Sequence, residues 1–141
     1  MPSYTFAYPS TREANDRMLD DLRRKLGEDR VDPDLINGIS LTVSEAFTNA
    51  VMHGNREDRT KKVTLLLQVN ECEIIADIID EGSGGLERIN SRRPPAVYDE
   101  GGRGIDLIRY YADGCRFSET ADGGLRVTVH FHRARKDEYT V

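Results

Sequence analysis

The chain has 141 residues, which suits one domain with a sizeable core. Its net charge of -5 excludes a long-range attraction to nucleic acid, and no apolar run approaches the length of a membrane span. Residues 1–4 lack the pattern of a signal peptide, so we expect a cytoplasmic protein with neither membrane nor direct nucleic-acid partners. Cys72 and Cys115 are isolated in the sequence, which predicts buried, reduced thiols.

The first third of the chain predicts one strand and two helices. Residues 4–8 alternate as a strand does, and Pro9 ends the run. Ser10 and Glu13 have the spacing of a capping box before an apolar helical stripe that stops at Gly27. A second helix is expected over about 32–53, because Asp32 suits an N-cap and is followed by a proline. Residues 55–62 are polar and predict a loop.

The rest of the chain predicts strands that are neighbours in the sequence. They are expected at 63–69, 74–80, 116–118 and 125–131, with a short helix at 105–111. Residues 86–100 show no regular pattern, and a long loop in a compact domain favours a functional segment. Because the strands follow one another as hairpins, the sequence predicts a single α+β domain over 1–141. We expect a two-layer sandwich with helices on one face of a mixed, largely antiparallel sheet.

The second predicted helix carries a polar stripe beside its apolar face. Glu45 and Asn49 are four residues apart, so their side chains lie one turn apart on the same face, and Gly54 closes the helix. A carboxylate and a carboxamide in this arrangement can ligate a metal ion or accept a proton. An ordinary solvated helix face is the alternative interpretation.

Two glycine-containing segments are candidates for ligand binding. Asp80 ends a predicted strand and is followed by Gly82 and Gly84, so it can accept a hydrogen bond from an exocyclic amine, while the glycines admit a flat ligand. An ordinary turn has the same composition.

The second segment is Gly102-Arg103-Gly104, which precedes a predicted helix. Backbone N–H groups at a helix start suit phosphate, although a flexible hinge has the same composition. The sequence contains no GxxxxGK[ST], which excludes a P-loop. It has no GxGxxG after a strand of a βαβ unit, which disfavours a dinucleotide fold.

Together these elements resemble the ATP-binding fold of the gyrase, Hsp90, histidine kinase and MutL superfamily (the Bergerat fold). The resemblance extends from about residue 41 to residue 131. Within that superfamily, Ser44-Glu45-Ala46-x-x-Asn49-Ala50-x-x-His53-Gly54 is most similar to the anti-sigma-factor serine/threonine kinases. These regulators bind a sigma factor and phosphorylate an anti-anti-sigma (STAS-type) protein. The family also implies a homodimer.

The resemblance implies a role for each matching position. Glu45 would be the general base that takes the proton from the attacking serine hydroxyl, and Asn49 would hold Mg²⁺ at the ATP phosphates. Residues 86–101 would form the ATP lid, and Arg92, Arg93 or Arg103 would neutralise phosphate charge. The other nucleotide-binding positions would be His53, Asp80, Gly82, Gly84, Gly102 and Gly104.

Two positions depart from the pattern of many relatives. Gly101 replaces a serine, and Leu125 replaces a threonine that helps the aspartate to hold adenine through water. The alternative function is therefore a non-catalytic anti-sigma or regulatory binding protein in which ATP is structural or absent. Retention of Glu45 favours the kinase, because a binder needs no base there. A sensor histidine kinase is disfavoured, because residues 1–31 leave no room for a phosphoacceptor hairpin.

Overall fold

The computed structural model describes residues 3–91 and 108–133. These residues form a five-stranded sheet of order β1-β2-β3-β5-β4, in which every neighbouring pair is antiparallel. The strands are β1 (Ser3–Pro9), β2 (Lys62–Val69), β3 (Glu73–Ile79), β4 (Gly114–Glu119) and β5 (Leu125–His132). The helical elements are α1 (Ala14–Glu28), α2 (Pro33–Asn49), the π-helical turn η1 (Ala50–Gly54), α3 (Gly85–Ser91) and residues 108–111.

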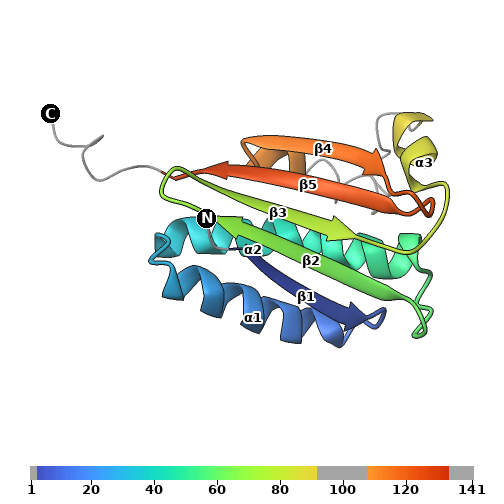
Figure 1. Cartoon of the computed structure of the whole chain (residues 1–141), viewed down its shortest axis with the longest axis horizontal. Helices are drawn as coiled ribbons and strands as arrows, with labels where there is room; N and C mark the ends of the chain where they lie inside the picture. Colours follow the sequence, from blue (N-terminus) through green and yellow to red (C-terminus); the bar gives the residue numbers. More distant parts are fainter. Residues whose placement is uncertain (1–2, 92–107, 134–141) are drawn as a thin grey trace, which may run out of the picture.

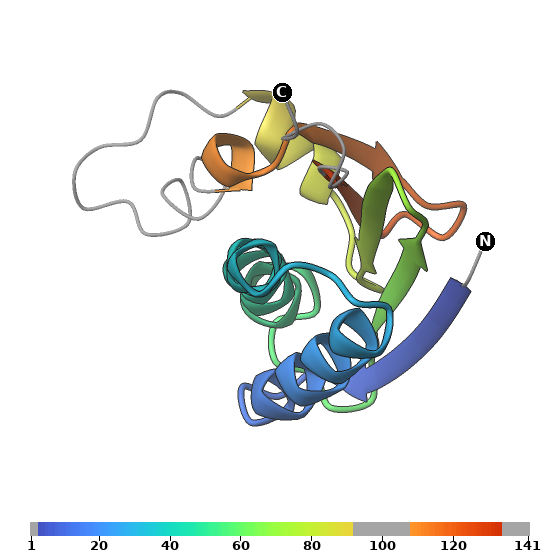
Figure 2. The ribbon, with the colours of Figure 1, turned by 90° about the vertical axis from the view of Figure 1, so that its left-hand side faces the viewer.

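The molecule has two layers, with α1 and α2 side by side on one face of the sheet (Figure 1, Figure 2). Strand residues that face these helices stand opposite one another, as Leu65 does with Ile78. Fully burying such a side chain contributes about 1.5–3 kcal/mol relative to leaving it exposed. The helices complete this core with Met18, Leu22, Ile39, Val43 and Phe47. The predicted α+β sandwich is therefore confirmed.

The opposite face of the sheet is polar at its centre. Asp77 is only 3% exposed. The Arg126 guanidinium donates to its two carboxylate oxygens at 3.2 and 3.1 Å, and the Thr128 hydroxyl donates to it as well. A buried carboxylate is tolerated where such partners replace the lost water. The pair ties β3 to β5 on the side away from α1 and α2.

The predicted start of α2 is confirmed, and the end of α1 differs slightly. Asp32 Oδ1 accepts the N–H of Asp34 at 2.9 Å, and Pro33 occupies the first turn. Gly27 does not stop α1, which runs one residue further. The left-handed backbone at this end belongs to Arg30, with φ of 59°.

The capping box expected before α1 is wrong. The side chain of Glu13 makes no capping hydrogen bond. Ser10 is fully buried, and its hydroxyl donates to the carbonyl oxygen of Lys61 at 2.7 Å. Thr11 supplies the cap instead, because its hydroxyl oxygen accepts the N–H of Ala14 at 3.2 Å. The spacing of neighbouring residues could not reveal that Ser10 bonds the distant backbone of Lys61 instead.

Two other predictions need correction. Residues 86–91 lie in helix α3 rather than in an irregular loop. Cys72 is exposed, not buried, whereas Cys115 is half-buried, and neither is part of a disulfide bond. Burial raises the pKa of the Cys115 thiol. Among the described residues, no helix combines the length and apolarity that a membrane crossing requires.

Candidate functional site

The C-terminal end of α2 continues into the π-helical turn η1. The N–H of Asn55 donates to the carbonyl oxygen of Ala50, five residues back, at 2.8 Å. Single π-turns inside helices occur frequently at functional sites. Just before the turn, Glu45 and Asn49 are both half-buried, while Phe47 lies in the core. The polar stripe is therefore present, next to an unusual helix end.

This helix end lies directly against the end of β3. A Cβ atom built on Gly54 would lie 2.1 Å from Asp80 Oδ2, and one built on Gly82 would lie 2.2 Å from the carbonyl oxygen of Gly54. A Cβ built on Gly124, just before β5, would lie 2.2 Å from the carbonyl oxygen of Asp80. Only glycine fits at these three positions. We call these four residues, with Asn55, the Asp80 corner.

The carboxylate of Asp80 is fixed by backbone donors. Asp80 is only 5% exposed. Oδ1 accepts the N–H of Gly82 at 2.9 Å and the N–H of Leu125 at 3.0 Å. Hydrogen bonds to an ionised acceptor are stronger than neutral ones. Because Leu125 donates through its backbone N–H, leucine makes this contact as well as threonine would. Compared with threonine, leucine lacks only the side-chain hydroxyl.

Asn55 is one of two residues of this corner that the sequence did not predict. It was expected in a polar loop, but it is 1% exposed. Its side chain bonds Ser10, the backbone of Lys62 and the backbone of Glu81. The one available clue was a carboxamide directly after the helix-ending glycine. Gly124 was also missed as a site residue, since Gly123-Gly124 predicted only a turn.

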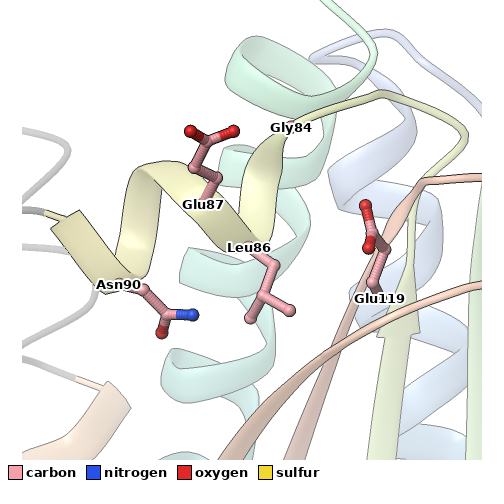
Figure 3. Close-up of a pocket in the computed structure, with 5 residues that line it drawn as sticks. All are labelled: Gly84, Leu86, Glu87, Asn90 and Glu119. Atoms are coloured by element: carbon pink, nitrogen blue, oxygen red, sulfur yellow. The ribbon is translucent and has the colours of Figure 1, made fainter.

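A hollow of about 430 Å³ lies beside α3 (Figure 3). It is lined by Gly84, Leu86, Glu87 and Asn90 together with Glu119 at the end of β4. Gly84 has a φ of 71°, a left-handed conformation that favours glycine. Among the predicted site residues that the structure describes, only Gly84 lines this hollow, which therefore lies next to the Asp80 corner rather than within it.

The remaining predicted positions divide into two groups. His53 is exposed within η1. Residues 92–101 of the expected lid lie outside the described residues, as do Gly101, Gly102, Arg103 and Gly104. The structure therefore brings together Gly54, Asp80 and Gly82, and it leaves the phosphate-binding segment untested.

The chemistry of this corner fits a nucleotide and a hard cation. An anchored carboxylate can accept a hydrogen bond from an exocyclic amine. Carboxamide and carboxylate oxygens, as in Asn49 and Glu45, are the ligands that Mg²⁺ prefers. Asn49 precedes Gly54 by five residues, and the π-helical turn η1 lies between them.

Comparison with known proteins agrees with this chemistry. The model of a histidine kinase-like ATPase domain matches residues 8–131. The chain is 29% identical over 110 residues to an anti-sigma F factor of Clostridium beijerinckii, covering 71% of this chain and 74% of that protein. It is 26% identical over 114 residues to an anti-sigma F factor of Bacillus subtilis, covering 75% and 78%.

A solved structure shares the fold. It contains the RsbU and RsbW domains of Rv1364c from Mycobacterium tuberculosis, and it matches with a TM-score of 0.71 at 21% sequence identity. The match covers 96% of this chain but only 33% of that longer chain.

Proposed function

The chain belongs to the histidine kinase-like ATPase domain family, and on this premise we propose that it is an ATP-dependent anti-sigma factor and protein serine/threonine kinase. In this proposal residues 1–141 form one ATP-binding domain in the cytoplasm. The observation that carries the proposal is the close contact between Gly54, at the end of η1, and Asp80; Gly54 follows Asn49 by five residues and Glu45 by nine. The two anti-sigma F factors support the partner class by their similarity.

Each group would act within its own chemistry. Asp80 would accept the adenine amine, with Gly82 and Gly84 shaping the base pocket, and Asn49 would hold Mg²⁺, which neutralises phosphate charge when bound. Glu45 would accept the proton of the substrate hydroxyl. Phosphoryl transfer requires positioning and charge neutralisation more than covalent chemistry, so this small set is sufficient. Gly102, Arg103 and Gly104 would bind phosphate, and His53 would lie near the nucleotide.

The proposed partners are a sigma factor and a STAS-type anti-anti-sigma protein that carries the phosphorylated serine. We also propose a homodimer, which light scattering of the purified chain would test. A second candidate function is a non-catalytic binder of a regulatory partner. Leu125 favours it, because a leucine side chain has no hydroxyl that could support a bridging water at Asp80. The two candidates differ in whether phosphate reaches the partner.

Nucleotide binding is the first test. Calorimetry with Mg-ADP should show saturable binding to the wild-type chain. Asp80→Asn should weaken it roughly 5- to 150-fold, because an amide can present a donor to the adenine amine at a cost of about 1–3 kcal/mol. Asp122→Asn, in the exposed turn between β4 and β5, is the matched control and should bind normally. Equal affinity in all three proteins would contradict the assigned role of Asp80.

Phosphate transfer is the second test. Purified chain, Mg-ATP and candidate anti-anti-sigma proteins should yield phosphoserine or phosphothreonine on the partner, detected by mass spectrometry. Glu45→Gln should lower the rate by about 10²–10⁴-fold while leaving nucleotide affinity nearly intact, and Asn49→Ala should remove the Mg²⁺ dependence of binding. Glu28→Gln, on the exposed end of α1, is the control. Tight partner binding without transfer by the wild type would favour the non-catalytic binder.

A further inference from the structure

Asn55 uses its whole side chain to join three segments that are distant in the sequence. Its Nδ2 donates to the Ser10 hydroxyl oxygen at 2.7 Å and to the Lys62 carbonyl oxygen at 2.9 Å. Its Oδ1 accepts the N–H of Glu81 at 2.7 Å. Both amide hydrogens and the carbonyl oxygen are therefore engaged in a residue that is 1% exposed.

We propose that Asn55 is a positioning residue for the nucleotide site, which fixes the Asp80–Gly82 turn against the end of η1. This inference rests on the proposed ATP binding. Glu81, which Asn55 binds through its backbone N–H, lies between Asp80 and Gly82 in the chain. The backbone N–H of Asn55 also closes η1 on Ala50. One residue thus holds both sides of the Gly54–Asp80 contact.

The neighbouring bonds make this connection rigid. The Glu81 carboxylate accepts the N–H of Lys62 at 2.6 Å, so the turn after β3 is held through both its backbone and a side chain. Ser10, which receives one hydrogen from Asn55, passes its own to the carbonyl oxygen of Lys61. A fully satisfied buried network specifies a single arrangement, and a partly satisfied one is costly.

The backbone directly after Asn55 is strained at two residues. Arg56 and Glu57 both have left-handed φ values, 53° and 57°, which are uncommon for residues other than glycine. Their conformation is held by the N–H of Glu57, which donates to Val51 at 2.7 Å, and by the Arg12–Glu57 ion pair at 3.1 Å. Such strain persists only where surrounding contacts fix it.

A carboxamide is the group that the three partners require. Aspartate has almost the same size and keeps an acceptor for Glu81, but it cannot donate to the Lys62 carbonyl oxygen. Asn55→Asp therefore breaks the bond that ties Asn55, and with it the Glu81 turn, to Lys62, with little change in volume. Ser10→Ala removes a buried partner on the far side of Asn55 and leaves the bonds to Lys62 and Glu81 intact. Ser10→Ala is therefore the matched control, because it should lower the stability of the fold without releasing the Asp80–Gly82 turn.

The experiment measures Mg-ADP affinity by calorimetry at low temperature, and the free energy of unfolding by urea, in wild type, Asn55→Asp and Ser10→Ala. Both variants should be less stable. Asn55→Asp should bind Mg-ADP about 10- to 100-fold more weakly, the range typical of residues that orient ligand-binding groups, and Ser10→Ala should bind within about twofold of wild type. Equal affinities in the two variants would overturn the proposal, because Asn55 would then be only structural.

Hydrogen exchange of the wild-type chain tests the same joint without any substitution, should Asn55→Asp fail to fold. Mg-ADP should slow exchange of the Glu81 amide together with the amides of Gly82 and Leu125. A Glu81 amide that exchanges independently of those two would overturn the proposal. Failure of ATP binding itself is recognised separately, because the wild type would then give no calorimetric saturation.

Discussion

Polar groups cluster at both ends of β3, and the two clusters differ in how they hold the neighbouring segments together. At the end that follows Ile79, the segments of the Asp80 corner lie so close together that three of its positions accept only glycine. Its carboxylate and carboxamide are anchored by N–H and carbonyl groups within 3.0 Å. The result is a closely packed joint in which Gly82 and Gly124 are buried.

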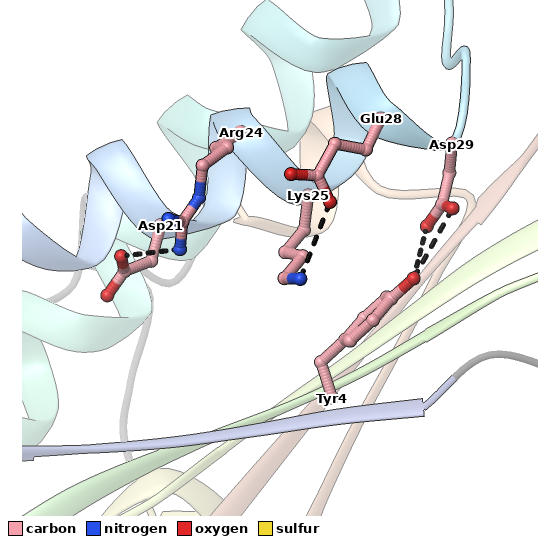
Figure 4. Close-up of polar contacts among 6 residues, drawn as sticks. All are labelled: Tyr4, Asp21, Arg24, Lys25, Glu28 and Asp29. Carbon is pink, nitrogen blue, oxygen red and sulfur yellow. Dashed lines mark hydrogen bonds and ion pairs between the residues drawn. The ribbon is translucent and has the colours of Figure 1, made fainter.

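At the other end, long side chains reach across the segments. Arg133 donates to the carbonyl oxygens of Asn70 at 2.7 Å and of Asp29 and Arg30 at 3.2 Å each. The Tyr4 hydroxyl donates to the Asp29 carboxylate at 3.1 and 3.3 Å (Figure 4). We call these five residues the Arg133 corner. Long charged and phenolic side chains join its segments, whereas glycines let the segments of the Asp80 corner meet directly.

The comparison shows that hydrogen bonding alone does not identify a ligand site. Both corners join the ends of strands and helices through buried or half-buried polar groups. Only the Asp80 corner combines fixed acceptors with positions that exclude every side chain. We therefore assign the nucleotide to the Asp80 corner and a purely structural role to the Arg133 corner, and the following substitutions test this division.

The largest effect is expected for Gly82→Ala. Its methyl group would meet the carbonyl oxygen of Gly54 at 2.2 Å, and backbone cannot yield as a flexible side chain does. We expect a loss of about 3 kcal/mol in the free energy of unfolding, at the upper end of ordinary overpacking, and no measurable binding of Mg-ADP. Urea denaturation and calorimetry measure the two effects.

Gly38→Ala is the control for that substitution. Gly38 lies within α2, and no atom lies within 4 Å of the position that an added methyl group would take. Alanine there should stabilise the fold by about 0.5–1 kcal/mol, because glycine is unfavourable in a helix interior. A Gly82→Ala chain that is as stable as wild type and binds Mg-ADP normally would show that the corner is less tightly closed than the structure indicates.

The second substitution, Arg133→Met, keeps most of the aliphatic stem and removes three donated hydrogen bonds. We expect a loss of about 1–2 kcal/mol in the free energy of unfolding. Hydrogen bonds from a charged group stabilise the fold more than neutral ones, but the partial exposure of Arg133 to solvent reduces that contribution. Mg-ADP affinity should stay within about twofold of wild type. Arg116→Met, on the exposed side of β4, is the control and should change neither quantity. A marked loss of nucleotide affinity in Arg133→Met would mean that the two corners are coupled.

The sequence predicted features that depend on neighbours along the chain. Alternation in β2 located the core face, and Asp32 with Pro33 located the start of α2, because strand faces and helix caps are determined within a few residues. The family resemblance is carried by such local runs, which is why it identified the ATPase family correctly.

Contacts between distant segments were not predictable from those patterns. Ser10 bonds Asn55 across 45 positions and Lys61 across 51, so its capping-box spacing was misleading. Asn55 was assigned to a polar loop, because a carboxamide gives no local sign that it is buried. Gly54 and Asp80 were each singled out, yet only the fold shows that they touch. The roles of Glu45 and Asn49 stay predictions.

The smallest effect is expected for two tyrosines that lie four residues apart on β1 and bond carboxylates at α1 and its C-terminal end. Tyr4 bonds Asp29 in the Arg133 corner, whereas Tyr8 is 4% exposed and donates to Asp21 at 2.6 Å. Burial, followed by the hydrogen bond to Asp21, raises the pKa of Tyr8. Burial and the bond to Asp29 raise the pKa of Tyr4 as well.

A phenol whose pKa is higher in the folded chain stabilises the fold fully below its unfolded pKa, which is about 10. That contribution is lost as the pH rises further, since the unfolded chain then releases a proton that the folded chain keeps. The free energy of unfolding should therefore fall between about pH 9 and about pH 11. Tyr8→Phe should flatten this fall more than Tyr4→Phe, because Tyr8 is the more deeply buried phenol. Urea denaturation of the wild type and the two variants at both pH values measures the difference. If Tyr4→Phe reduced the pH dependence of the free energy of unfolding as much as Tyr8→Phe or more, the Arg133 corner, not the Tyr8 end of β1, would be responsible for it.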